Sequence, residues 1–216
     1  MGGNVSGTKD AIGVYASTRR QLRGIAESLV AGPQYRAAGT IRLAVRPDGF
    51  AATALPLSVH ATEFTWQDDS APLTGPVGAI AAAAGVDYGP PVGVYDLRDP
   101  LPADAELDID PGAAELLHRC LYAGGFALKQ ALPEEHPVLW PEHFDVSVTE
   151  AEVNYGVSAG DEQHPLPYAY VGPWTPRTGA FWNAPFGALR PLNPGHDVDR
   201  LAEEIAGFFA EGRATA

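Results

Sequence analysis

Residues 140–174 read WPEHFDVSVTEAEVNYGVSAGDEQHPLPYAYVGPW, and this stretch decides the fold that the sequence predicts. Apolar and polar residues alternate over 144–149 and again over 153–157, which is typical of half-buried β-strands. A short turn near Glu150 and Ala151 makes these two runs an antiparallel hairpin. A loop over 158–167 then leads to a third strand over 168–172. The stretch therefore predicts three consecutive antiparallel strands.

Five ionisable side chains gather at one end of these predicted strands. In the hairpin, Asp145 is expected opposite about Gly156, and His143 opposite about Ser158. The following loop leaves the sheet at the same end and carries Asp161, Glu162 and His164. We expect Asp161 or His164 to lie within about 10 Å of His143 or Asp145, a distance of two strand spacings. The sequence predicts one candidate site composed of His143, Asp145, Asp161 and His164.

Two kinds of chemistry suit this candidate site. A carboxylate can orient His143 or His164 so that the imidazole transfers protons near neutral pH, and this is the catalytic role that we predict for the four residues. Two imidazoles with one or two carboxylates also suit zinc, iron or manganese, so the same residues are candidate ligands of a divalent metal cofactor. Their spacing fits no zinc finger and no H-E-x-x-H helix. Both alternatives stay open at this point.

A structural role is the third interpretation of these residues. Asp161 can cap backbone N–H groups of its own loop. His164 can lie half exposed before Pro165, and His143 can pack beside Trp140. In that case the chain is a structural or interaction protein without catalysis.

Ser158 lies in the sequence Gly-Val-Ser-Ala-Gly, which matches the G-x-S-x-G elbow of serine hydrolases. The elbow requires a strand before the serine and a helix directly after it. Pro165 and Pro167 follow closely and oppose such a helix. We therefore do not assign Ser158 as a nucleophile.

Aromatic residues are dense in this stretch and shortly after it. We predict that they form one wall of a pocket for a small-molecule ligand, with the two histidines as its polar groups. The candidate ligand-binding residues are Trp140, Tyr155, Tyr168, Trp174, Trp182 and Asn183. The alternative is that these side chains belong to the hydrophobic core.

The composition indicates a cytoplasmic protein and limits its partners. Among 216 residues, 27 acidic against 14 basic side chains give a formal charge of -13, which opposes binding to nucleic-acid phosphates and to anionic membrane surfaces. We therefore expect neither nucleic acid nor membrane as a partner. Cys120 is the only cysteine, so no internal disulfide can form. The oligomeric state stays open.

The first quarter of the chain predicts a long helix followed by a hairpin. Apolar residues at helical spacing predict an amphipathic helix over about residues 8–31. Gly32 and Pro33 are expected to stop it. Alternating residues over 41–46, followed by Pro-Asp-Gly at 47–49, predict a tight turn between two strands.

Two further helices complete the predicted fold. Asp110 is a suitable N-cap for a central helix that Pro111 begins. A Gly-Gly pair at 124–125 indicates a kink or a close contact in this helix. Asp197 or Asp199 is expected to cap a C-terminal helix. We predict a single α+β domain over residues 1–216, with an antiparallel sheet and an N-terminal, a central and a C-terminal helix.

The chain resembles a family of actinobacterial proteins of about this length in three motifs: WPEHFD at 140–145, NYGVSAGDEQHPLPYAYVGPW at 154–174 and FWNAPFGA at 181–188. The resemblance covers most of the chain, including GTIRLAVRPDGF at 39–50. It implies a bacterial, cytoplasmic origin. The family has no established activity or ligand, so no catalytic residue follows from the resemblance. Ala159 stands where relatives are expected to carry proline, which affects only the stiffness of the loop.

Overall fold

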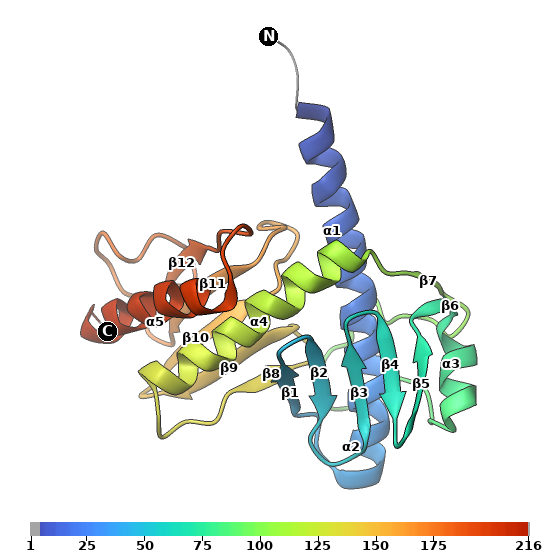
Figure 1. The fold of residues 1–216 in the computed structure, drawn as a ribbon. Helices are drawn as coiled ribbons and strands as arrows, with labels where there is room; N and C mark the ends of the chain where they lie inside the picture. The colour runs from blue at the N-terminus through green and yellow to red at the C-terminus, as the bar shows by residue number, and fades with distance from the viewer. Residues whose placement is uncertain (1–4, 216) are drawn as a thin grey trace.

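The computed structural model describes residues 5–215, and a helical arm opens the fold (Figure 1). The arm consists of α1 (Val5–Ile25), the π-helical segment η1 (Ala26–Ala31) and α2 (Gly32–Ala38). It ends at Gly39, whose left-handed φ of 69° terminates α2. The arm is therefore longer than the predicted helix over residues 8–31.

The predicted helix stop at Gly32 and Pro33 is wrong. Proline has no N–H, and a π-helical bond from residue 33 would run to the carbonyl of Ser28. That carbonyl instead accepts a hydrogen bond at 2.9 Å from the backbone N–H of Gly89. Pro33 itself lies in the first turn of α2, where a missing N–H is tolerated. A contact distant in sequence thus lets the helical arm continue through the proline.

Within residues 5–215, ten antiparallel strands form one sheet in the order β12-β11-β10-β9-β8-β1-β2-β3-β4-β5. Its strands are β1 (Leu43–Arg46), β2 (Gly49–Ala52), β3 (Leu57–His60), β4 (Glu63–Trp66), β5 (Asp69–Pro72), β8 (Val138–Trp140), β9 (Asp145–Glu150), β10 (Val153–Ser158), β11 (Tyr168–Pro173) and β12 (Ala188–Pro191). Two meanders, β1–β5 and β8–β12, meet where Leu43 of β1 pairs with Leu139 of β8. A separate small sheet pairs β6 (Thr74–Pro76) with β7 (Glu106–Asp108).

The three predicted strands β9, β10 and β11 are consecutive and antiparallel, as expected. Their register differs from the prediction, because Asp145 pairs with Ser158 and Gly156 pairs with Ser147. The turn is formed by Ala151 and Glu152, with φ angles of 48° and 62°, as a two-residue hairpin requires. It lies one residue later than predicted, and a shift of one residue in a hairpin turn moves every cross-strand partner by two.

The central helix α4 (Pro111–Ala131) packs on β9, β10 and β1 and against the C-terminal helix α5 (Val198–Thr215) (Figure 1). At Gly124 an added Cβ would lie 2.6 Å from the side chain of Val157, and at Gly125 it would lie 2.7 Å from that of Val45. The Gly-Gly pair therefore marks a close contact within a continuous helix. A short helix, α3 (Val77–Ala84), follows β6. The α+β class with N-terminal, central and C-terminal helices is confirmed.

Candidate functional site

The candidate site lies at one end of β9–β11, on the side of these strands that faces away from α4. β9 begins at Asp145, β10 ends at Ser158 and β11 begins at Tyr168, and the register places these three residues in one row. Side chains two residues apart on a strand share a face, so Tyr170 lies on the same face. Val157 and Val146 point the other way, toward Gly124 of α4. We call this surface the outer face of β9–β11.

Asp145 is a buried carboxyl in this row. Its exposed fraction is 5%, its Oδ2 accepts a hydrogen bond from the hydroxyl of Tyr170, and its Oδ1 has no hydrogen-bond partner among the described residues. Burial raises the pKa of Asp145 from 3.8 to about 6, against the opposing effects of the Tyr170 hydrogen bond and the nearby His143. Asp145 can therefore gain or lose a proton close to neutral pH.

The ring of Tyr170 covers Asp145. It crosses Gly156 of the neighbouring strand, where an added Cβ would lie 2.5 Å from the Tyr170 ring. Glycine at this position is what allows the tyrosine to lie flat against the sheet and reach the carboxylate. Asp145 was expected on the exposed face of its strand. It is on that face, but the tyrosine from β11 buries it.

We expect the stability of the protein to report the ionisation of Asp145. The folded state holds the proton more tightly than the unfolded chain, so stability is lost as pH rises from about 4 through about 6. The stability of the wild type relative to an Asp145→Asn variant should fall by on the order of 2–3 kcal/mol between pH 4 and pH 7. Urea unfolding of both proteins at each pH measures this difference. A difference that stays constant with pH would contradict the raised pKa.

Asp161 serves the loop between β10 and β11. Its Oδ1 accepts hydrogen bonds at 2.7 Å from the backbone N–H groups of Gln163 and His164, and its Oδ2 accepts one at 2.6 Å from the hydroxyl of Tyr168. Burial raises the pKa of Asp161, but these three hydrogen bonds outweigh it and the pKa is lowered overall. Asp161 is thus held as a carboxylate that caps the loop, as the structural interpretation expected.

The helical arm also donates hydrogen bonds to the loop between β10 and β11. Nη1 of Arg19 donates to the backbone carbonyl of Asp161 at 2.9 Å and to that of Pro165 at 3.3 Å. The hydroxyl of Tyr15 donates to the carbonyl of Ala159 at 2.8 Å. Only 9% of Arg19 is exposed, since its side chain lies between α1 and this loop. The loop is therefore held by α1 as well as by Asp161.

The two histidines lie at this end of the strands but do not form a tight cluster. His143 is exposed in the turn between β8 and β9. His164 is half-buried, with its Nδ1 3.9 Å from Oδ1 of Asp161 and its ring 5.4 Å from the ring of Tyr168, between centroids. Among residues 5–215 no group of three or more His, Cys, Asp or Glu side chains is arranged to hold a metal ion. A metal site at the four predicted residues stays a prediction.

The predicted aromatic wall is divided among several places. Tyr155 is 2% exposed and packs on Phe209 of α5, because strand alternation points it into the core. Trp140 lies under the guanidinium of Arg42, 5.8 Å from its ring centroid. On the outer face, Tyr168 is buried while Trp174 is 63% exposed. The prediction that all of these residues form one pocket wall is therefore wrong.

The other two predicted ligand-binding residues lie in the segment between β11 and β12. Trp182 packs edge to face on Phe181, with ring centroids 4.9 Å apart. Asn183 exchanges two hydrogen bonds with the backbone of Leu189, at 3.0 Å and 2.8 Å. The side chain of Asn183 is used to shape this segment.

A row of aromatic rings on the outer face was missed by the sequence interpretation. Neighbouring ring centroids lie 5.4 Å apart from His164 to Tyr168, 6.4 Å from Tyr168 to Tyr170 and 6.5 Å from Tyr170 to Phe186. The spacing of Tyr168 and Tyr170 by two residues is a signal that could have placed both rings on one face. Phe186 could not have been placed, because it reaches the row from the loop before β12.

Glu27 is a second buried carboxyl that sequence analysis missed. It is 1% exposed, and its Oε1 has no hydrogen-bond partner in the described part of the chain. Burial raises its pKa, while the charge of Arg23 and the hydroxyl of Tyr95 act in the opposite direction. Glu27 lies in the π-helical segment, and every residue of that segment is buried.

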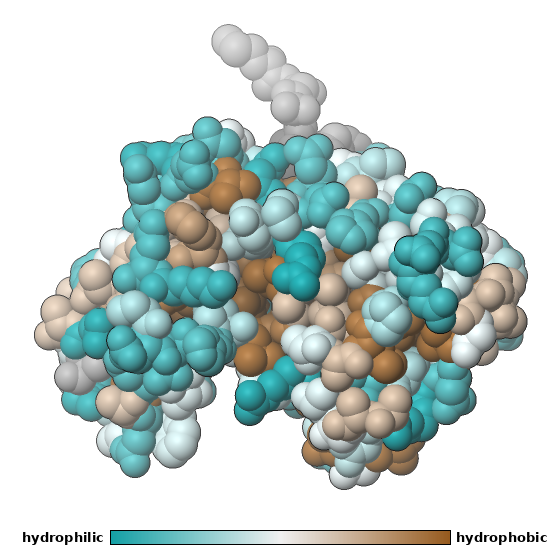
Figure 2. Space-filling view, turned by 60° about the horizontal axis from the view of Figure 1, so that its bottom comes forward, coloured by the Kyte–Doolittle hydropathy of each residue, from teal (hydrophilic) through white to brown (hydrophobic). Residues whose placement is uncertain are grey.

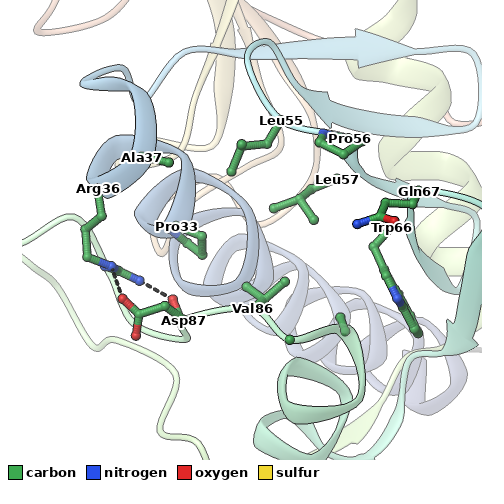
Figure 3. Close-up of a pocket in the computed structure, with 12 residues that line it drawn as sticks. Pro33, Arg36, Ala37, Leu55, Pro56, Leu57, Trp66, Gln67, Val86 and Asp87 are labelled. Atoms are coloured by element: carbon green, nitrogen blue, oxygen red, sulfur yellow. Dashed lines mark hydrogen bonds and ion pairs between the residues drawn. The ribbon is translucent and has the colours of Figure 1, made fainter.

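An open groove of about 420 Å³ lies away from the outer face (Figure 3). It is bounded by α2, by the connection from β2 to β3, by the end of β4 and by the segment after α3. Figure 2 brings this side of the molecule forward, and hydrophobic residues gather in the middle of the face among hydrophilic ones. The β3–β4 hairpin joins two of these segments, but α2 and the segment after α3 are distant from it in sequence, so no local motif predicts the groove.

No helix in the described part of the chain is both long enough and apolar enough to cross a membrane. The resemblance to an actinobacterial family stays an expectation, because it rests on the motifs alone. Comparisons of the chain with protein-family models, with curated proteins and with solved structures found no match.

Proposed function

We propose that the chain binds a small, ring-containing polar molecule on the outer face of β9–β11 and that Asp145 exchanges a proton with it. The observation that carries this proposal is the state of Asp145, a buried carboxyl with one oxygen unpartnered among the described residues and a pKa of about 6. Groups used in acid–base catalysis need a pKa near the working pH. Perturbed carboxyls of this kind are concentrated at functional sites.

The surroundings of Asp145 support a ring-shaped ligand. The row from His164 to Phe186 offers aromatic faces and edges, and Phe186 is 43% exposed. Flat molecules gain stacking energy on such rings. The exposed imidazole of His143 is close enough to favour the charged form of Asp145. A ligand reaches the carboxyl when the ring of Tyr170 turns aside, which is the one movement that the proposal requires.

This assignment modifies the role predicted from sequence. The acid–base group is Asp145, and His143 is the neighbouring imidazole. Asp161 holds the loop and Tyr168 through hydrogen bonds, so it positions the site without taking part in proton transfer. His164 contributes its ring to the aromatic row. The hydroxyl of Tyr168 is bonded to Asp161, which keeps that ring in place, whereas the bond from the hydroxyl of Tyr170 to Asp145 opens when the ligand binds.

Ligand-observed NMR with a library of polar ring compounds tests this function. We expect compounds that bind the wild type to lose at least about tenfold in affinity for an Asp145→Asn variant, because a charge-assisted hydrogen bond is lost. Their affinity for the wild type should change between pH 5 and pH 7.5, while affinity for the variant should not. Asp69→Asn is the matched control, since Asp69 is exposed on the edge strand β5.

Two outcomes would count against the proposal. The Asp145 site is wrong if the compounds that bind have equal affinity for the wild type and the Asp145 variant at both pH values. A library without any ligand for the outer face would favour the structural or interaction role, in which Asp145 and Tyr170 form a buried hydrogen bond and nothing more.

A further inference from the structure

The groove beside α2 has no part in the function proposed above. Its volume of about 420 Å³ falls within the range of small-molecule sites in proteins. Leu57 of β3, Pro33 of α2 and Val86 after α3 are turned toward one another across it (Figure 3). The floor and walls are therefore apolar and come from separate elements.

The charged groups of the groove neutralise each other. Nε of Arg36 lies 2.6 Å from Oδ2 of Asp87, and its Nη2 donates to the backbone carbonyl of Asp87. Its Nη1 donates to the carbonyls of Gly89 at 3.2 Å and Pro90 at 3.3 Å. Four of the five N–H donors of the guanidinium are thus bonded within the protein. Neither an anionic nor a cationic ligand finds a free counter-charge there.

An aromatic ring and an amide lie at the end of the groove opposite Arg36. Trp66 is half-buried and stacks on the buried ring of Phe64, with centroids 5.7 Å apart and planes inclined by 27°. This packing holds the indole in one orientation, so a flat ligand can contact it without ordering it first. Gln67 adds an exposed carboxamide at the rim, which can donate or accept a hydrogen bond.

We infer that this groove is a binding site for an uncharged, largely apolar small molecule that carries a flat ring. The ring contacts Trp66 and the aliphatic side chains, and one polar atom of the ligand reaches Gln67. The ion pair of Arg36 and Asp87 closes one end of the site and is not broken by binding. The removal of apolar surface from water supplies the affinity. Among ligands of equal size, an uncharged ligand should therefore bind more tightly than a charged one.

Three probes of nearly equal shape test this inference: 2-naphthalenemethanol, 2-naphthoate and 2-naphthylmethylammonium. Titration calorimetry with the full chain should show that the neutral alcohol binds at least about tenfold more tightly than either charged probe. Tighter binding of the naphthoate or of the ammonium compound would overturn the predicted ligand class. If none of the three probes binds, the inference that the groove is a binding site is wrong.

A matched pair of variants locates the binding. Ala37 and Ala38 are neighbouring exposed residues of α2, but only Ala37 lines the groove. Ala37→Glu places a charge in the apolar wall and should raise the dissociation constant of the alcohol at least about tenfold. Ala38→Glu should leave the constant unchanged, and equal unfolding temperatures of the two variants show that both are folded. If both variants weaken binding of the alcohol equally, or if neither does, the alcohol binds elsewhere on the protein.

Discussion

Replacing Gly32 by alanine is expected to lower the free energy of unfolding by about 3 kcal/mol or more, the upper range for overpacking a close contact. An added Cβ would lie 1.8 Å from the carbonyl oxygen of Gly89 and 2.9 Å from its carbon. Both sides of this contact are backbone, so no side chain can turn aside to relieve it. Separation of the two segments would also break the hydrogen bond from Gly89 to Ser28.

Equilibrium unfolding in urea of the wild type and the Gly32→Ala variant measures the effect. The control is Gly207→Ala on α5, where an added Cβ has no atom within 4 Å. Alanine is the better helix former by up to about 1 kcal/mol, so this control should be neutral or stabilising. A loss below about 1 kcal/mol for Gly32→Ala would mean that the segment around Gly89 does not lie against the helical arm.

The second large effect is expected from Phe144→Ala, which should destabilise the fold by about 3–5 kcal/mol, as for other buried phenylalanines. Phe144 is 1% exposed, and its ring meets that of Phe50 edge to face with centroids 5.7 Å apart. Its φ of 51° is unfavourable for a non-glycine residue. The buried ring holds the backbone in this conformation, directly before Asp145.

Phe126→Ala is the matched control, because Phe126 is 45% exposed on α4. Its truncation should cost less than about 1 kcal/mol, as for most surface substitutions. The same denaturant titration compares both variants with the wild type. If Phe144→Ala cost no more than the control, Phe144 would not anchor the turn from Trp140 to Asp145. The position of Asp145 under Tyr170 would then need another explanation.

Phe144 also connects the core to the proposed site. Its backbone N–H donates to the carbonyl of Trp140 at 2.7 Å, and its own carbonyl accepts from Ala159 at 3.4 Å. These bonds join the turn that carries His143 to the end of β10. We therefore expect partial loss of this anchor to change the environment of Asp145 as well as the stability of the fold.

The sequence by itself determined those helices and strands whose patterns lie within a short stretch of neighbouring residues. Alternation of apolar and polar residues located β9 and β10, and the Pro-Asp-Gly turn joined β1 to β2. Asp110 caps α4 by accepting from the N–H of Ala113 at 2.8 Å, and Asp197 caps α5 by accepting from that of Arg200 at 2.9 Å. Such signals act through neighbours in the chain, so they can be recognised without the fold.

Only the tertiary structure decided the features that depend on distant partners. The helical arm passes Pro33 because Gly89 bonds the carbonyl of Ser28. Asp145 is buried because the ring of Tyr170 crosses Gly156 and reaches it. The burial of a carboxyl, its pKa and the apolar groove beside α2 all depend on packing between segments far apart in sequence, and alternation or capping patterns carry no information about such packing.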